Sequence, residues 1–497
     1  MVSNLNDESR EAGVQFAAVD GTRSSQRAGK IVLADAVRAV DPDLATRVER
    51  TKDWRKTYIE PFTEMVVAGT GSAKDALRIA ADGLDALHRN MTLVRDGNEI
   101  ALRDAMASKV DAFETKTVEG RGERQKELTV PYRGDLLRGD ELERQLEAWE
   151  SNDVMEPSCR AALSLVIANP GWLDLSDRYF ALLGASSEIG PLGPLSSWGA
   201  NILAVDLPRA HLWEHILDTA RAGSGRVHVP VPAGSSGDLA PTAGFDLLTM
   251  TPEARSWLGT FEQPFTIGNY VYADGANFVR LASAVDALIE DVLHSRPDVS
   301  LAYLATPTDV FAVPEEVATH AIAKRRSSVL KRAVASTSGT RLYAPNYKTL
   351  VTGEGDRKWG ISDSLVPIQG SNYALAKSLQ RWRAIVSREE GTLTSANVAP
   401  ASRTVSVTKN KVLAAVYRGA PAFGVEIFEP ATTRVLMAAL LVHDLRNEKA
   451  TARPDTQLDH PFDLFVDAAL HGGIWRLPYQ SRSILPLGLV KGFLKRA

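Results

Sequence analysis

The chain has 497 residues, more than one ordinary compact domain needs and enough to bury a large core. Hydrophobic residues make up 44% and charged residues 24%, which excludes a disordered or fibrous chain. The 61 acidic and 57 basic residues leave a formal charge of −4. This balance excludes a broad basic surface for nucleic acid or an anionic membrane and favours a small-molecule substrate.

Cysteine and histidine usage points to a reducing compartment. The single cysteine, Cys159, cannot form an internal disulfide, and the nine scattered histidines give no metal-ligand spacing, so we expect no metal site. The polar N-terminus lacks the basic and apolar parts of a signal peptide, and no apolar run is long enough for a transmembrane segment. We therefore expect a cytoplasmic protein.

The first third of the chain carries few functional signals. Residues 1–30 are polar and predict a flexible lead-in. Residues 31–170 predict a mainly helical N-terminal region, because apolar residues such as Ile31, Leu33 and Val37 recur at helical spacing. We assign no function to this region.

After residue 178 the pattern changes to short apolar strands that alternate with helices. The first two predicted strands are 179–183 and 202–205. This alternation predicts an α/β fold with a Rossmann-like doubly wound parallel sheet.

A glycine turn follows the first of these strands. The order is strand, glycine turn 184–190, short helix, second strand and Asp206, as in a dinucleotide-binding unit. Glycines let the backbone approach a phosphate, and Asp206 can accept hydrogen bonds from ribose hydroxyls, which favours NAD. Arg209 leaves NADP open. The candidate cofactor-binding residues here are Gly184, Ser186, Ser187, Ile189, Gly190 and Asp206.

A second signal lies in GSNYALAKSLQRWRAIVSREEG. It predicts a helix with Tyr373 and Lys377 one turn apart on one face. A phenol is a poor proton shuttle at neutral pH, but a neighbouring ammonium favours the phenolate and lowers the phenol pKa. We therefore expect Lys377 to lower the pKa of Tyr373, which would act as a general acid and base.

These two signals together resemble the short-chain dehydrogenase/reductase superfamily over residues 179–310 and 360–445. The glycine turn matches GxxxGxG with Glu188 in place of the middle glycine, and TSANVAPASRT follows the tyrosine helix at the family's distance. The resemblance implies that Tyr373 moves the proton and that Lys377 also holds the nicotinamide ribose. It places Pro400 and Thr404 near the nicotinamide, with Ala401 replacing the usual glycine.

The family also uses a hydroxyl to bind the reacting oxygen and an asparagine in a proton relay. The resemblance points first to Ser362 for the hydroxyl. Ser364, Thr306 and Thr308 remain alternatives. Asn277, at the start of a predicted helix, is the relay candidate, and helix capping is its other role.

The resemblance also implies a domain plan. Residues 171–450 would form the Rossmann-like domain, with an insertion at about 311–359, and residues 451–497 a C-terminal extension. We expect an NAD(P)-dependent oxidoreductase acting on an alcohol or carbonyl, in a homo-oligomer as is common in the family. An NAD-retaining epimerase or dehydratase and a non-catalytic Rossmann scaffold or nucleotide sensor are the alternatives.

Overall fold

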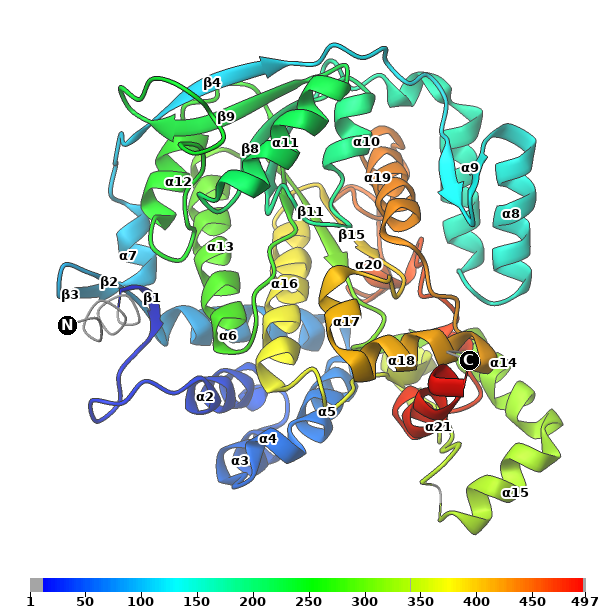
Figure 1. Cartoon of the computed structure of the whole chain (residues 1–497). Coiled ribbons are helices and arrows are strands. Elements are labelled where there is room, and N and C mark those ends of the chain that lie inside the picture. Colours follow the sequence, from blue (N-terminus) through cyan, green and yellow to red (C-terminus); the bar gives the residue numbers. More distant parts are fainter. Residues whose placement is uncertain (1–11, 340, 495–497) are drawn as a thin grey trace.

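A seven-stranded sheet forms the centre of the protein in the computed structural model, which describes residues 12–339 and 341–494. The strand order is β15-β11-β10-β7-β8-β9-β4, and six strands are parallel while β4 runs antiparallel to β9 (Figure 1). The strands are β4 (Phe113–Glu119), β7 (Tyr179–Leu183), β8 (Asn201–Val205), β9 (Arg226–Pro232), β10 (Phe265–Asn269), β11 (Ser300–Ala305) and β15 (Thr394–Val398). The predicted α/β class with strands at 179–183 and 202–205 is confirmed.

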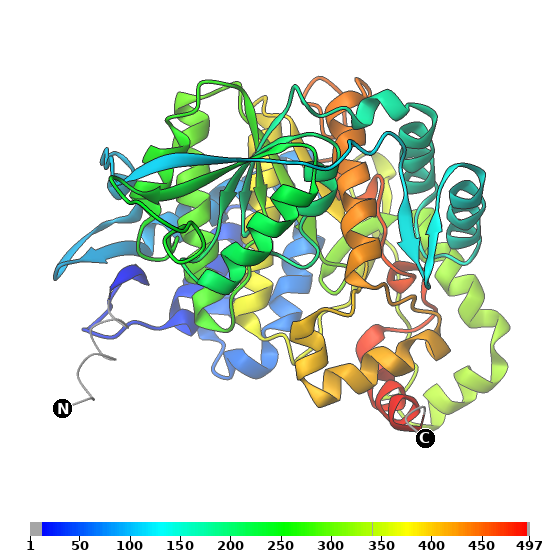
Figure 2. The ribbon, with the colours of Figure 1, turned by 45° about the horizontal axis from the view of Figure 1, so that its top comes forward.

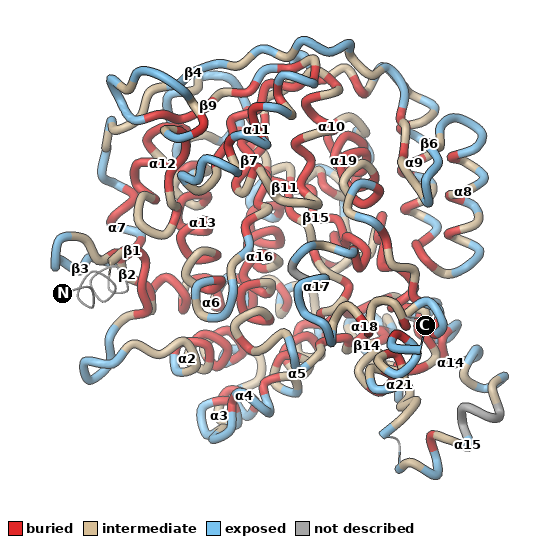
Figure 3. The backbone as a smooth tube through the Cα atoms, viewed as in Figure 1, coloured by how far each residue is buried: buried red, intermediate tan, exposed pale blue. Residues whose placement is uncertain are grey.

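The central strands are apolar along their whole length because helices cover both faces of the sheet. In β7, Ala181 and Leu183 face one hydrophobic cluster, whereas Phe180 and Leu182 face the other. Figure 3 shows the two layers as buried segments on either side of the strands. The first layer holds α12 (Thr251–Leu258), α13 (Ala276–Ser295) and α16 (Ser371–Glu389). The second holds α9 (Pro157–Ala168), α10 (Leu192–Ser197), α11 (Ala210–Ala222) and α19 (Pro430–Arg446).

The N-terminal helices form a further layer outside α16 (Figure 2), except the last of them, which packs on α12 and α13. They are α2 (Ser25–Arg38), α3 (Pro42–Arg50), α4 (Trp54–Thr57), α5 (Ile59–Gly69), α6 (Ala73–Arg89) and α7 (Leu102–Met106). The packing of α6 on α16 is close: a Cβ at Gly83 would lie 2.5 Å from the ring of Trp382. Glycine is needed at this crossing because the indole occupies the space of a side chain.

The prediction of a flexible lead-in over residues 1–30 is wrong for the residues that the structure describes. Strand β1 (Gly13–Phe16) is buried and pairs with β2 (Met91–Arg95), which also pairs with β3 (Asn98–Ala101). Arg280 of α13 donates to the carbonyl of Val14 at 2.5 Å. This long-range pairing explains why a polar local sequence is ordered. Residues 1–11 lie outside the described part of the chain.

The predicted helical region 31–170 is helical in its first part but does not stand apart from the sheet. Strand β4 joins the sheet edge beside β9, and α8 (Gly139–Ser151) packs on α9, which contacts α19. A short hairpin of β5 (Val130–Tyr132) and β6 (Asp135–Leu137) lies between them in sequence. This stretch therefore completes the sheet and one of its layers.

The predicted insertion forms a small antiparallel sheet with the order β12-β14-β13. Its strands are β12 (Val310–Pro314), β13 (Val351–Thr352) and β14 (Lys358–Asp363), and its helices are α14 (Glu315–Ser327) and α15 (Val329–Thr337). Helix α5 contacts both β12 and β14. The insertion is thus held against the N-terminal layer.

The C-terminal part contains α17 (Val405–Lys409), α18 (Lys411–Gly419), α20 (Asp463–Val466) and α21 (Ser481–Leu494). Helix α21 packs on α18 at the lower right of Figure 1, whereas α20 contacts β15. Short 3₁₀ turns occur at Pro170–Leu173, Glu354–Asp356, Ala420–Phe423 and Ile474–Arg476. Among the described helices, none combines the length and the apolar character that crossing a bilayer requires.

Candidate functional site

The glycine turn begins where β7 ends, and its backbone geometry requires glycine. Gly184 has a φ of +81°, and a Cβ there would lie 3.0 Å from the carbonyl oxygen of Tyr270. The amide of Gly190 donates to the carbonyl of Ser187 at 3.0 Å and closes the turn before α10. Ser186, Ser187 and Ile189 are half-buried in the same turn. The predicted order of strand, turn, helix, strand and acid is confirmed.

Asp206 follows β8 and fastens the glycine turn to it. One carboxylate oxygen accepts the amide of Ser186 at 2.7 Å, and the other accepts the amide of Leu207 at 2.8 Å. A carboxylate has about four acceptor positions, so each oxygen can accept a further donor. Asp206 is half-buried, which leaves it accessible at the sheet edge.

Glu188 points away from the turn towards the segment after β15. Its Oε2 accepts the amide of Val405 at 2.8 Å, and its carbonyl accepts two hydrogen bonds from the guanidinium of Arg434 at 3.0 and 2.6 Å. The bond to Val405 brings the glycine turn close to Thr404, the N-cap residue of α17, and Pro400 is buried just after β15. Sequence reasoning missed Arg434, because nothing in the sequence links α19 to the turn.

Tyr373 and Lys377 lie on one face of α16, as predicted, and both contact α13. The ring of Tyr373 lies 5.6 Å from that of Phe278, and Nζ of Lys377 lies 5.9 Å from the centre of the same ring. The amine of Lys377 donates to the carbonyl of Leu304 at 3.2 Å and to Gln380 at 2.9 Å. Burial lowers the pKa of Lys377 to about 8.

The expected effect of Lys377 on the phenol is wrong for this arrangement. The pKa of Tyr373 is raised, chiefly because burial disfavours the phenolate, and a hydrogen bond with Thr306 opposes this rise only in part. The lysine amine is directed to Leu304 and Gln380 instead. The phenol is therefore held in its protonated form at neutral pH.

Of the four hydroxyls that competed in the sequence, Thr306 is the one that acts on the pKa of Tyr373. Thr308 bonds Thr306 at 2.9 Å and accepts a hydrogen bond from Gln369. Ser362 was expected first, but it lies in β14 opposite Phe311 and its hydroxyl faces Tyr347. The insertion explains this displacement, because its small sheet takes up the serine strand.

Two further predicted residues lie beside the site rather than in it. Ser364 of the same segment lies 3.4 Å from the hydroxyl of Ser481. Asn277 is exposed in the first turn of α13, where its oxygen accepts a hydrogen bond from Arg280 at 2.8 Å. Its neighbour Phe278, rather than Asn277 itself, faces Tyr373 and Lys377.

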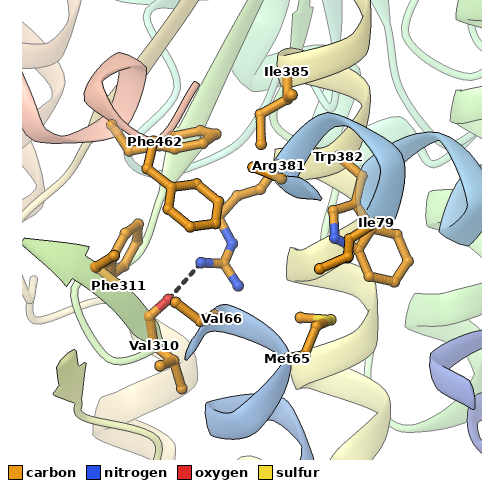
Figure 4. A pocket seen from close by; sticks show the side chains of 12 residues that line it. Met65, Val66, Ile79, Val310, Phe311, Arg381, Trp382, Ile385 and Phe462 are labelled. Atoms are coloured by element: carbon orange, nitrogen blue, oxygen red, sulfur yellow. Dashed lines mark hydrogen bonds between the residues drawn. The ribbon is translucent and has the colours of Figure 1, made fainter. Parts of the chain in front are cut away.

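A buried ion pair behind the lysine was not predicted. Asp309 is 2% exposed, and its carboxylate lies 3.3 Å from the guanidinium of Arg381, which also donates to the carbonyl of Val310 at 2.5 Å. Figure 4 shows the Arg381 side chain extending from α16 into an otherwise apolar cavity of about 30 Å³. Such a volume holds about two water molecules. In the sequence, only the spacing of Tyr373, Lys377 and Arg381 by four residues could have indicated that Arg381 belongs to this site.

The candidate residues therefore gather at the carboxyl ends of the parallel strands. Gly184 follows β7, Asp206 follows β8, Thr306 follows β11 and Pro400 follows β15. The fold and the site define an α/β protein with its polar groups at one edge of a mostly parallel sheet. In comparisons with known proteins, no family model, no curated protein and no solved structure matches this chain.

Proposed function

We propose that the protein is an NAD(P)-dependent oxidoreductase that resembles the short-chain dehydrogenases and acts on an alcohol or carbonyl carbon. The observation that carries the proposal is the strand order. Counted from β7, the six parallel strands lie in the order 3-2-1-4-5-6, which is that of the doubly wound dinucleotide-binding sheet. In that fold the ligand binds outside the carboxyl ends of the strands, where the glycine turn and Tyr373 lie.

The residues at the glycine turn are compatible with a dinucleotide. Glycine at position 184 allows the left-handed φ of the turn and its close approach to the Tyr270 backbone, which gives the turn the shape that a phosphate would meet. Asp206 would accept the adenosine ribose hydroxyls, which favours NAD. Glu188 turns its carboxylate to Val405, so its charge is directed away from the turn. The bound nicotinamide would supply or accept the hydride.

The chain's own contribution to the chemistry is proton transfer. Tyr373 would donate its phenolic proton to a carbonyl oxygen as hydride reaches the carbon, and the burial that raises its pKa would slow this transfer. The Thr306 hydroxyl, which acts on the phenol, would orient the same oxygen. Lys377 would hold the nicotinamide ribose by its amine.

One observation favours a second candidate, the non-catalytic nucleotide sensor. Both carboxylate oxygens of Asp206 already accept backbone amides, and burial keeps the Tyr373 phenol from ionising, with the ring of Phe278 at 5.6 Å. Such an enclosed phenol suits a structural role as well as a catalytic one. Binding of a nucleotide without turnover would favour this candidate.

The test is titration of the full-length protein with NADH and with NADPH, followed by calorimetry. We expect NADH to bind more tightly, and Asp206→Ala to weaken it about tenfold because a ribose acceptor is lost. Tyr373→Phe should leave the affinity unchanged. Asp218→Ala, which removes an exposed aspartate of α11, is the matched control.

Thermal melting of each variant separates lost affinity from lost folding, since Asp206 also holds the glycine turn. Binding by neither nucleotide would refute the proposal. If NADH binds, a panel of ketones and aldehydes would follow, and turnover that survives Tyr373→Phe would rule out the assigned proton donor.

A further inference from the structure

The end of β11 and the loop that joins it to β12 face one side of α16. The carbonyl of Leu304 accepts from Lys377, Asp309 pairs with Arg381, and the Thr306 hydroxyl acts on Tyr373. Tyr373, Lys377 and Arg381 are spaced by four residues, so they lie along one face of the helix. One small cavity is lined by Thr306, Asp309, Lys377 and Arg381 together with Tyr303, Leu304, Ala305, Gln380 and Phe465. The four polar side chains therefore line one enclosed cavity.

The charges in this space do not balance without Asp309. Lys377 and Arg381 are two cations one turn apart, an arrangement that is unfavourable in a helix and more so away from water. Arg381 lowers the pKa of Lys377 and Asp309 raises it. Burial raises the pKa of Asp309, whereas the charges of Arg381 and Lys377 lower it. The carboxylate of Asp309 is thus the negative charge that acts on both Lys377 and Arg381.

The other groups that face this cluster carry less weight at the lysine. Asp363 of β14 raises the pKa of Asp309, but it is paired with Arg482 of α21 at 2.5 Å. From α13, Phe278 presents a ring to the lysine. Tyr272 and Tyr417 act on Tyr373. Asp309 lines the same cavity as Lys377 and is the carboxylate that acts on its charge, while its direct ion pair is with Arg381.

We propose that Asp309 is the counter-ion of Lys377 and a positioning residue for the proposed reaction, with Arg381 orienting its carboxylate. Asp309 keeps the lysine amine in its ammonium form, in which it can hold a ribose hydroxyl and face the phenol. The catalytic consequence rests on the proposed function, whereas the ionic arrangement does not depend on any cofactor.

The experiment measures the titration of Lys377 itself. Full-length protein labelled with [13Cε]lysine is followed by NMR from pH 6 to pH 11, and Lys377→Arg identifies the resonance. In the parent protein we expect a midpoint near 8. In Asp309→Asn the midpoint should fall by about one pH unit, a tenfold loss of proton affinity, because an opposite charge nearby has been removed.

Two further variants test the direction of the shift in the Lys377 midpoint. Arg381→Gln should raise the midpoint, since a like charge is lost and Asp309 is left to Lys377 alone, whereas general loosening of the site would move both variants the same way. Asp363→Asn, which removes the neighbouring carboxylate paired with Arg482, is the matched control and should shift the midpoint by less than about 0.3 pH units.

An unchanged or raised midpoint in Asp309→Asn would overturn the proposal. If that variant does not fold, Arg381→Gln decides alone, and an unchanged or lowered midpoint there would be equally decisive. The result is distinguishable from failure of the proposed function. Absence of NADH binding would leave the Lys377 titration as predicted, and absence of the titration shift would leave NADH binding untouched.

Discussion

The two ends of the candidate site are assembled differently. The glycine-turn end comes from one continuous stretch, from Tyr179 to Asp206, with its strand, turn, helix and acid in sequence order. The tyrosine end joins α16 to β11, to the loop after it and to Phe278 of α13. Its geometry therefore depends on packing between distant segments, whereas that of the glycine turn depends mainly on local backbone geometry.

Each end of the site is therefore sensitive to a different kind of substitution. The glycine turn should fail when one backbone position is changed, because φ and close approach fix its shape. The tyrosine end should fail when the contacts that hold α16 are changed, even far from Tyr373. The following predictions separate the two kinds of dependence.

The largest effect is expected at the buried ion cluster that holds α16 to α13 and α6. Asp286 accepts two hydrogen bonds from Arg383 at 2.8 Å and contacts His88 at 2.8 Å. Asp286→Asn should lower the free energy of unfolding by about 3 kcal/mol, because Arg383 keeps a buried and poorly compensated charge. Denaturant unfolding measures it. Asp291→Asn, at a half-exposed pair on the same helix, should cost less than about 1 kcal/mol.

The same pair predicts a pH dependence. Arg383 holds the pKa of Asp286 well below its usual value, which is about 3.9 in an unfolded chain. The stabilisation is therefore complete above about pH 5 and is lost as the pH falls below about 4. The difference between the parent protein and Asp286→Asn should shrink over that range, and a constant difference would contradict this account.

A smaller effect is expected at the glycine turn. Gly184→Ala should cost about 2 kcal/mol, since a left-handed φ is strained for alanine and the new Cβ meets the Tyr270 carbonyl. It should also weaken NADH binding. Gly193→Ala, three residues beyond the turn in α10, has no neighbour closer than 3.9 Å and should be neutral or slightly stabilising. Equal losses in both variants would remove the special role of Gly184.

A further prediction compares two of the four competing hydroxyls. Thr306→Val should cost about 1 kcal/mol, because it removes a hydroxyl that bonds Thr308 and acts on the Tyr373 phenol. If turnover is found, the same change should reduce kcat by about tenfold or more, while Ser362→Ala leaves it unchanged. A larger loss in Ser362→Ala would restore the serine to the site.

The smallest effect is expected for Asn277. The side chain is exposed and bonds only Arg280 among the contacts of the described residues, so Asn277→Ala should change the free energy of unfolding by less than about 0.5 kcal/mol. NADH affinity measured alongside should not change. A loss of turnover in this variant would instead support the proton relay implied by the family resemblance.

Sequence patterns predicted those features that depend on residues close together along the chain. The strands at 179–183 and 202–205, the turn between them and the shared face of Tyr373 and Lys377 follow from spacing along the chain. The hydroxyl that acts on Tyr373 was not the one predicted first, because the strand that carries Ser362 pairs with β12 in the small sheet of the insertion. Nor was the pKa of Tyr373 predicted, which burial raises, since a sequence does not show how deeply a side chain lies.

The antiparallel edge strand has a consequence for synthesis of the chain. Strand β4 pairs with β9, which the ribosome produces about a hundred residues later. At about 5–20 residues per second, β4 waits for several seconds without its partner. Its sequence FETKTVE alternates threonine with charges at Glu114, Lys116 and Glu119, which discourage pairing with other nascent chains. The strand can therefore remain unpaired until its partner emerges.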